Sequence, residues 1–159
     1  MNQIRNRRAR QSGVAAVELA LILPILVFII VITAYFGRLF WHYTVAMKAA
    51  SDTAVLLATA PRSEIGVAKA DLGEVDIVKF ARSIAQEEIS ELNRGDNARP
   101  PVDIACDGYP CRGTSVPAQI GVLITLKVID PVFAGYTGDF LEDGGITLHA
   151  EAKVQYVGN

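Results

Sequence analysis

A predominantly apolar run at residues 14–36, directly behind a basic leader, constrains the fold of this chain most strongly. Glu18 is the only charged residue between Arg10 and Arg38. As an α-helix the run would be roughly 35 Å long, enough to cross a hydrocarbon core of about 30 Å with some tilt. We therefore predict a transmembrane helix. Because a central charge costs roughly 2.5–3.5 kcal/mol in such a helix, Glu18 should have a partner or a function.

The charges are distributed unevenly along the chain. Four of the 15 Lys and Arg lie in the first 13 residues, which contain none of the 17 Asp and Glu, so the rest of the chain is acidic. Positive flanks stay in the cytoplasm, and we expect the N-terminus inside and the body outside. A basic arm could instead bind nucleic acid or lipid. The adjacent span favours an orienting role, and an acidic body offers no general phosphate-binding surface.

Helical periodicity predicts two helices. The first continues from near Val14 without a breaker to Ala60, and its second half carries a stripe of alanines four residues apart. These are Ala46, Ala50, Ala54 and Ala58. The second is predicted over 74–93 from an apolar stripe at helical spacing. The stripe consists of Val78, Ala81, Ala85, Ile89 and Leu92. Residues 61–73 are interpreted as a linker.

The C-terminal third changes to the alternating pattern of strands with one buried face. Two strands are predicted at 120–129 and 146–156, and a shorter one at 102–105. We predict an α+β fold with a long N-terminal transmembrane and stalk helix, a second helix and a small antiparallel sheet. The expected division is a cytoplasmic leader at 1–13, a transmembrane and stalk helix at 14–60, and an exported α+β domain at 61–159.

The two cysteines, Cys106 and Cys111, lie in the segment Cys-Asp-Gly-Tyr-Pro-Cys. In an exported domain a local disulfide is the default, and Asp107-Gly108 suits the tight turn that would bring the sulfurs together. A redox pair would have a different spacing, and a zinc site would need further clustered ligands. We predict a disulfide that closes a short loop at the surface.

The N-terminal residues resemble a known family. A basic leader, Gly13, Val-Ala-Ala-Val, Glu18 and an apolar run are similar to the processing site of prepilin-like proteins. The following Leu-Ala-Leu-Ile-Leu-Pro, with Pro24, resembles TadE-like minor pilins (pseudopilins) of the tight-adherence (Flp) pilus. The resemblance implies that a prepilin peptidase cuts between Gly13 and Val14. Leu19 stands where major Flp pilins tend to have an aromatic residue, which implies an accessory subunit.

Such a cut would place a new α-amine on Val14, which is largely protonated at neutral pH. Positions four apart share a helix face, so this cation can pair with Glu18 in the same chain, or with Glu18 of a neighbour. In low dielectric such a pair fixes register better than it adds stability. Ala16 and Ala20 give a small-xxx-small spacing beside the acid, which favours close helix approach in lipid.

The resemblance also implies a location and partners. We expect a non-enzymatic, single-pass subunit in the bacterial inner membrane, with a cytoplasmic N-terminus, a periplasmic C-terminal domain and a possible place in the extracellular pilus. The implied partners are the prepilin peptidase, the major Flp pilin, other TadE/TadF-type minor pilins and the inner-membrane assembly platform. No cofactor, metal or nucleic acid is expected.

Alternative interpretations remain open. The chain could be a signal-anchored periplasmic binding module or envelope enzyme with an uncleaved N-terminus, in which Glu18 lies close enough to the headgroups to be hydrated. His149 and Glu151 share a strand face and could bind a metal, but a solvated sheet face is favoured in the absence of a third ligand. An acidic segment at 139–143 is interpreted as a turn rather than a calcium loop.

Overall fold

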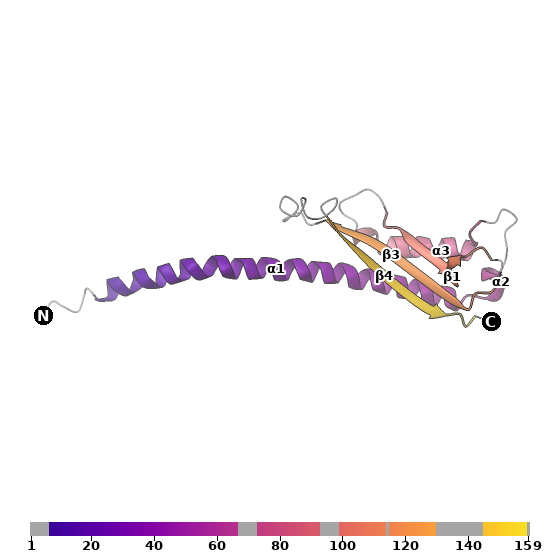
Figure 1. Cartoon of the computed structure of the whole chain (residues 1–159), viewed down its shortest axis with the longest axis horizontal. Helices are drawn as coiled ribbons and strands as arrows, with labels where there is room; N and C mark the ends of the chain where they lie inside the picture. The colour runs from indigo at the N-terminus through magenta and orange to yellow at the C-terminus, as the bar shows by residue number, and fades with distance from the viewer. Residues whose placement is uncertain (1–6, 67–72, 93–98, 114, 130–144, 159) are drawn as a thin grey trace. The chain divides into compact units, whose positions relative to one another are not determined.

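The computed structural model describes residues 7–66, 73–92, 99–113, 115–129 and 145–158. Contacts divide the chain into two compact units, Met1–Phe40 and Trp41–Asn159. The elements in chain order (Figure 1) are α1 (Arg7–Ala58), α2 (Arg62–Ile65), α3 (Asp76–Glu88), η1 (Ser90–Leu92), β1 (Val102–Cys106), β2 (Tyr109–Pro110), β3 (Gln119–Ile129) and β4 (Gly145–Gln155). One long apolar helix, short further helices and a small antiparallel sheet confirm the predicted α+β class.

The first unit consists of the N-terminal part of α1. This helix begins at Arg7, so the expected start near Val14 was wrong. The residues just before Val14 include good helix formers and no proline, and Gly13 alone does not stop a helix. α1 also continues through Pro24, which a membrane helix tolerates when the freed backbone group finds another partner.

The second half of α1 buries the predicted alanine stripe. Ala46, Ala50, Ala54 and Ala58 are each at most 1% exposed. Small side chains let other backbones come close to this face, and Leu57 adds a large buried side chain at its end. The helix ends at Ala58, just before the predicted stop at Ala60 and Pro61.

The second predicted helix is present but shorter than expected. α3 covers Asp76–Glu88 and is followed by the single 3₁₀ turn η1. Its predicted apolar stripe is buried from Val78 to Leu92. The linker prediction for 61–73 was wrong in part, because Arg62–Ile65 forms the short helix α2 and buries Ile65. Residues 67–72 lie outside the described part of the chain.

The sheet is antiparallel, with strand order β2-β1-β3-β4. All three predicted strands are confirmed, and β3 and β4 pair along their whole length, from Gln119 opposite Gln155 to Ile129 opposite Gly145. β2 was not predicted, because a two-residue strand leaves no periodic signal. Alternate residues of β3 are buried, namely Ile120, Val122, Ile124, Leu126 and Val128.

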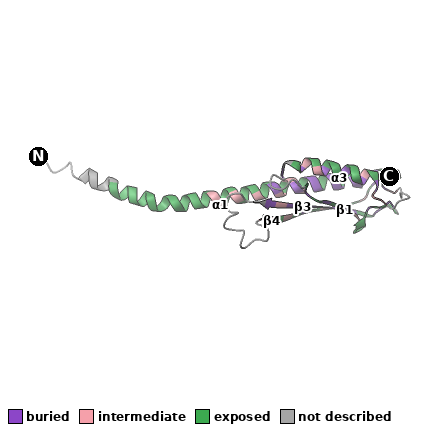
Figure 2. Ribbon diagram, turned by 90° about the horizontal axis from the view of Figure 1, so that it is seen from above, coloured by how far each residue is buried: buried purple, intermediate pink, exposed green. Residues whose placement is uncertain are grey.

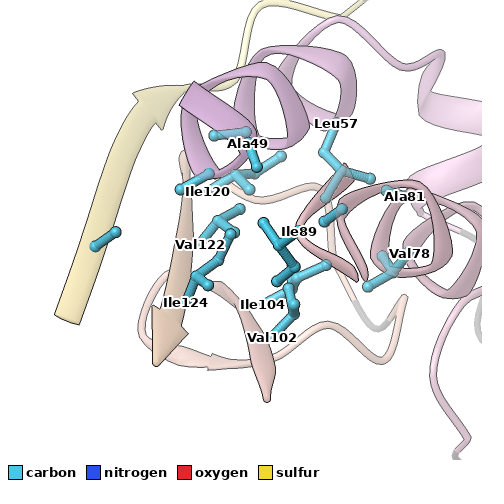
Figure 3. Close-up of a cluster of buried hydrophobic side chains, with 14 of the residues drawn as sticks. Ala49, Leu57, Val78, Ala81, Ile89, Val102, Ile104, Ile120, Val122 and Ile124 are labelled. Carbon is cyan, nitrogen blue, oxygen red and sulfur yellow. The ribbon is translucent and has the colours of Figure 1, made fainter. Parts of the chain in front are cut away.

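The core of the second unit lies between the helices and one face of the sheet. α3 and the second half of α1 cover this face (Figure 2). Figure 3 shows Leu57 of α1 and Val78 of α3 in the same cluster as Ile104 of β1 and Val122 of β3. Dense apolar packing of this kind is the main source of stability in a domain of this size.

The residues after β4 cover the C-terminal end of α1. The Val157 N–H donates to the Ala58 carbonyl (3.0 Å), and the Tyr156 hydroxyl donates to the Ala60 carbonyl (2.7 Å). The last carbonyls of a helix have no partner within it, so the bond to Ala58 satisfies a helix-end acceptor, and the bond to Ala60 satisfies a carbonyl just beyond the helix. Gly158 is buried there, and a Cβ at this position would overlap the Ala60 carbonyl oxygen.

Candidate functional site

The candidate processing site lies inside the continuous helix α1. Gly13 and Val14 are both exposed, Val14 at 60%. A Cβ built on Gly13 would meet no atom within 4 Å. Glycine inside a helix costs roughly 0.5–1 kcal/mol relative to alanine. The packing of this chain therefore gives no reason for a glycine here.

The predicted assembly residues lie along the exposed surface of the same helix. Glu18 and Val14 are four residues apart, which places them on one face. Ala16 and Ala20, each two residues from Glu18, form a row of small side chains on the opposite side of the helix, so the expectation that they lie beside the acid was wrong. Pro24 lies just over one helical turn beyond Ala20. Among the side chains that the structure describes, none pairs with Glu18. Any partner of this acid would therefore come from outside the described side chains.

Apolar side chains surround Glu18 on all sides of the helix. Large hydrophobic residues from Val14 to Ile30 are each about half exposed or more, including Leu21 at 68% and Phe28 at 61%. Within the described part of the chain, one helix, in Gly13–Ala58, is long and apolar enough to cross a membrane, and its most apolar window has no buried residue. A helix that is apolar all round and not covered by protein matches a lipid environment.

Aromatic residues follow the apolar run, at the position where amphipathic rings settle at a membrane–water interface. Phe36, Phe40 and Trp41 are each at least 50% exposed. Trp41 also meets His42 edge to face, with ring centroids 5.1 Å apart. His42 is only 5% exposed and belongs to the packed part of the second unit, so it is not a free surface histidine.

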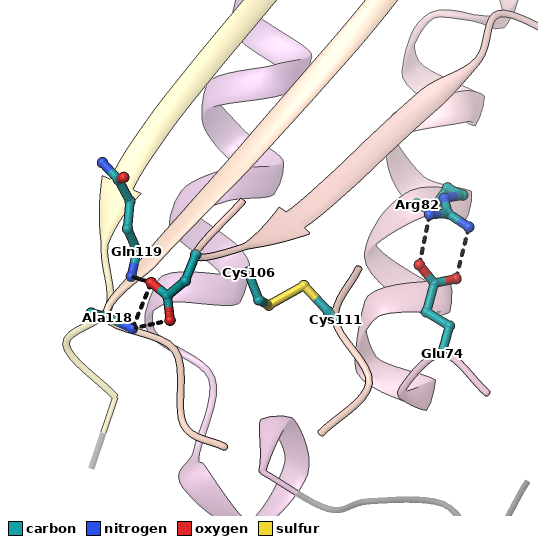
Figure 4. The surroundings of a disulfide bond; sticks show 7 residues. Glu74, Arg82, Cys106, Cys111, Ala118 and Gln119 are labelled. Atoms are coloured by element: carbon teal, nitrogen blue, oxygen red, sulfur yellow. Dashed lines mark hydrogen bonds and ion pairs between the residues drawn. A yellow bond between two sulfur atoms is a disulfide. The ribbon is translucent and has the colours of Figure 1, made fainter. Parts of the chain in front are cut away.

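The two cysteines form the predicted disulfide across the end of the β1–β2 hairpin (Figure 4). Asp107 and Gly108 form the two-residue turn, both with positive φ (52° and 83°), as the Asp-Gly signal of such hairpins predicts. The Asp107 carboxylate accepts hydrogen bonds from the backbone N–H groups of Ala118 (3.0 Å) and Gln119 (2.8 Å). The turn is thereby fixed to the beginning of β3.

Cys111 is not on a surface loop, and that part of the prediction was wrong. It is 3% exposed and belongs to the core, whereas Cys106 is half-buried. The Cys111 carbonyl accepts a hydrogen bond from the backbone N–H of Val75 (3.4 Å), the residue that precedes α3. Next to it Glu74 and Arg82 form a bidentate ion pair at 2.6 and 2.7 Å (Figure 4). The disulfide-closed segment that ends at Cys111 and the start of α3 are therefore in contact.

The candidate metal ligands lie on the sheet surface. His149 is exposed and its Nδ1 lies 3.3 Å from the Thr125 hydroxyl, while the Glu151 carboxylate pairs with Lys153 at 2.6 Å. Within the described residues no group of three His, Cys, Asp or Glu could hold a metal ion. The acidic segment at 139–143 lies outside them.

Sequence reasoning missed one connection between the helices. The Lys48 ammonium of α1 lies 2.7 Å from the Glu88 carboxylate of α3 and 3.4 Å from Asp52. These two acids, the hydrogen bond to Glu88 first, raise the pKa of Lys48 above its ordinary value of 10.5. The Lys48–Asp52 spacing is visible in the sequence, but nothing in it indicates the contact with Glu88, 40 residues away.

Comparison with known protein families matches the first part of the chain. The model of a family described as TadE-like protein matches residues 13–55. This confirms the resemblance that the leader and the apolar run indicated. The matched segment includes Gly13, Glu18 and most of the alanine stripe, and it ends before α3 and the sheet. No curated protein and no solved structure was matched.

Proposed function

We propose that this chain is a membrane-anchored, pilin-like structural or assembly subunit of a tight-adherence (Flp) pilus. A prepilin peptidase cuts it after Gly13, and Glu18 then helps to set the register between subunits. The TadE-like match at residues 13–55 carries this proposal, because it covers the span, the cleavage position and the acid together.

The state of Gly13 supports cleavage at this position. A residue that is unfavourable in a helix, yet has no atom within 4 Å of its missing Cβ, serves no packing purpose in the chain itself. A second molecule that must approach the backbone closely is a physical reason for such a glycine. A peptidase, whose active site must enclose the backbone that it cuts, is a molecule of this kind.

The surroundings of Glu18 support a role in registration. The acid lies on an exposed apolar surface, one helical turn from the Val14 nitrogen that cleavage would turn into a cation. In lipid both charges gain from pairing, within one chain or between adjacent subunits. Ala16 and Ala20 would let a second helix come close on the opposite face of α1, which adds a packing surface to the one that carries the acid.

The proposed setting follows from the same features. The chain spans the bacterial inner membrane once, with the four leader arginines in the cytoplasm and the acidic second unit in the periplasm or on the pilus. Its partners are the prepilin peptidase, the major Flp pilin, other TadE/TadF-type subunits and the inner-membrane platform. It has no enzymatic role in this proposal. The competing proposal is a periplasmic binding module or envelope enzyme held by an uncleaved anchor.

Two glycines in α1 provide a matched test of cleavage. Gly13 and Gly37 are both helical, and a Cβ at either position meets no atom within 4 Å. Neither Gly13→Val nor Gly37→Val should disturb the fold. We expect Gly13→Val to accumulate uncut protein in cells that contain the peptidase, whereas Gly37→Val should be cut like the wild type. Equal processing of both variants would contradict recognition of Gly13.

A further inference from the structure

We propose that the Cys106–Cys111 disulfide is a redox-sensitive latch that holds the first turns of α3 on the core of the second unit. Oxidation of the two thiols completes the packing of α3, and reduction releases its N-terminal half while the sheet stays folded. The proposal concerns the second unit alone and does not depend on the pilus function.

The β1–β2 hairpin is weak without the disulfide. Its strands pair at only two positions, Ala105 with Pro110 and Cys106 with Tyr109. Pro110 has no backbone N–H to donate, and short two-stranded hairpins are marginal in water. The position of the chain after Pro110 therefore depends on the covalent bond from Cys106 to Cys111.

Cys111 connects the disulfide to the start of α3. Its side chain is 3% exposed within the core, and its carbonyl accepts the N–H of Val75. Val75 is the N-cap residue of α3, is itself 3% exposed, and provides no side-chain cap. The start of α3 thus has the Glu74–Arg82 ion pair but no side-chain cap, and the backbone N–H of its N-cap residue bonds to the segment that the disulfide positions.

The rest of the hairpin and the far end of α3 have other anchors. The Asp107 carboxylate holds the turn to Ala118 and Gln119, on the β3 side of the hairpin. At the other end of α3, Glu88 pairs with Lys48 of α1. Loss of the disulfide therefore leaves the turn and the end of α3 in place and acts on the beginning of α3.

The redox step is ordinary thiol–disulfide exchange with an external dithiol. A thiolate attacks the sulfur of Cys106, the more accessible of the two, and Cys111 leaves as a thiolate that takes up a proton. The second thiol of the reagent then displaces Cys106. The chain gains two thiols, and the dithiol becomes a disulfide. Oxidation by a disulfide donor is the reverse.

Amide hydrogen exchange of the full chain in detergent micelles tests the latch. Oxidised protein is compared with dithiothreitol-reduced protein and with the Cys106→Ala/Cys111→Ala variant. We expect the amides of residues 76–81 to exchange faster by about tenfold or more in both, and those of β3 and β4 to change by less than about twofold. The reductant should have no further effect on the double variant.

Two results would overturn the proposal. Unchanged exchange at 76–81 would mean that the disulfide closes only its own hairpin. A uniform acceleration across α3, β3 and β4, or outright unfolding, would mean that it supports the whole unit rather than α3. As a control, Tyr109→Ala removes a side chain that is 76% exposed on the same hairpin and should leave the exchange of α3 unchanged.

Discussion

Glu18 is an ionisable residue on an apolar, uncovered helix surface, and none of the described side chains neutralises it. Its distance from the mature N-terminus would be a single helical turn, which is the range in which two side groups on a helix meet. The chain therefore provides the position of the acid, and cleavage would provide its counter-charge. At the residue scale, the proposed function depends on the pairing of Glu18 with the new Val14 amine.

Substitution of Glu18 should separate insertion from assembly. Glu18→Gln removes the charge but keeps the shape, so membrane insertion should equal that of the wild type or exceed it. Pilus assembly should fall by about tenfold or more, which corresponds to about 1.4 kcal/mol or more of lost interaction. Fractionation and counts of surface pili measure the two effects. Normal piliation of Glu18→Gln would rule out a registration role.

Gly158 allows a second prediction at this scale. Gly158→Ala should lower the free energy of unfolding by about 1–3 kcal/mol, because its Cβ would overlap the Ala60 carbonyl and the Tyr156 hydroxyl. Gly121→Ala is the matched control, since its Cβ would have nothing nearer than 3.8 Å. Denaturant unfolding of both variants measures the difference. Equal stability would argue against the tight closure of the C-terminal segment on α1.

At the scale of elements, α1 has two halves with opposite requirements. Its first half exposes large apolar side chains, and its second half buries alanines against the core. We expect Ala50→Leu to destabilise the second unit by about 1–3 kcal/mol through overpacking, and the adjacent Ser51→Leu to change stability by less than about 0.5 kcal/mol. Ala50 is 0% exposed, whereas Ser51 faces solvent. Thermal or denaturant unfolding of the two variants measures their stability. Equal losses of stability would contradict the burial of Ala50 in the core.

The Lys48 ion pairs join α1 to α3 and should respond to alkaline pH. A pKa that is raised in the folded state stabilises the fold below the unfolded value, and this contribution is lost as the pH rises through the raised pKa. Lys48→Met should therefore be less stable than the wild type at pH 8 and low salt, and the gap should close at pH values above 10.5. The effect is small and salt-sensitive because Lys48 is exposed. A stability difference between the wild type and Lys48→Met that widens with rising pH would contradict a stabilising role of the charged Lys48.

Most of the second unit could be predicted from periodicity, because a half-buried helix or strand repeats its apolar residues at a fixed spacing. This signal identified the alanine stripe, the buried face of α3 and both long strands. It could not identify the contact of Cys111 with Val75, or of Lys48 with Glu88, because these join segments far apart in sequence. The start of α1 was misjudged because a cleavage motif carries no helix stop signal.

At the scale of the whole molecule, the chain combines a unit without a core and a unit with one. Met1–Phe40 carries the exposed apolar helix and the candidate processing site, and Trp41–Asn159 carries the packed helices and sheet. The TadE-like match includes the candidate processing site and Glu18, and it ends within α1. The proposed pilus function therefore rests on the N-terminal segment.

The mature N-terminus of the native protein tests the central claim most directly. Mass spectrometry of the intact protein, purified from the membrane fraction of cells that contain the peptidase, gives this terminus. The account predicts a chain that begins at Val14, with Glu18 as its fifth residue. A native protein that retains Met1 through Gly13 would contradict it and would favour an uncleaved membrane anchor.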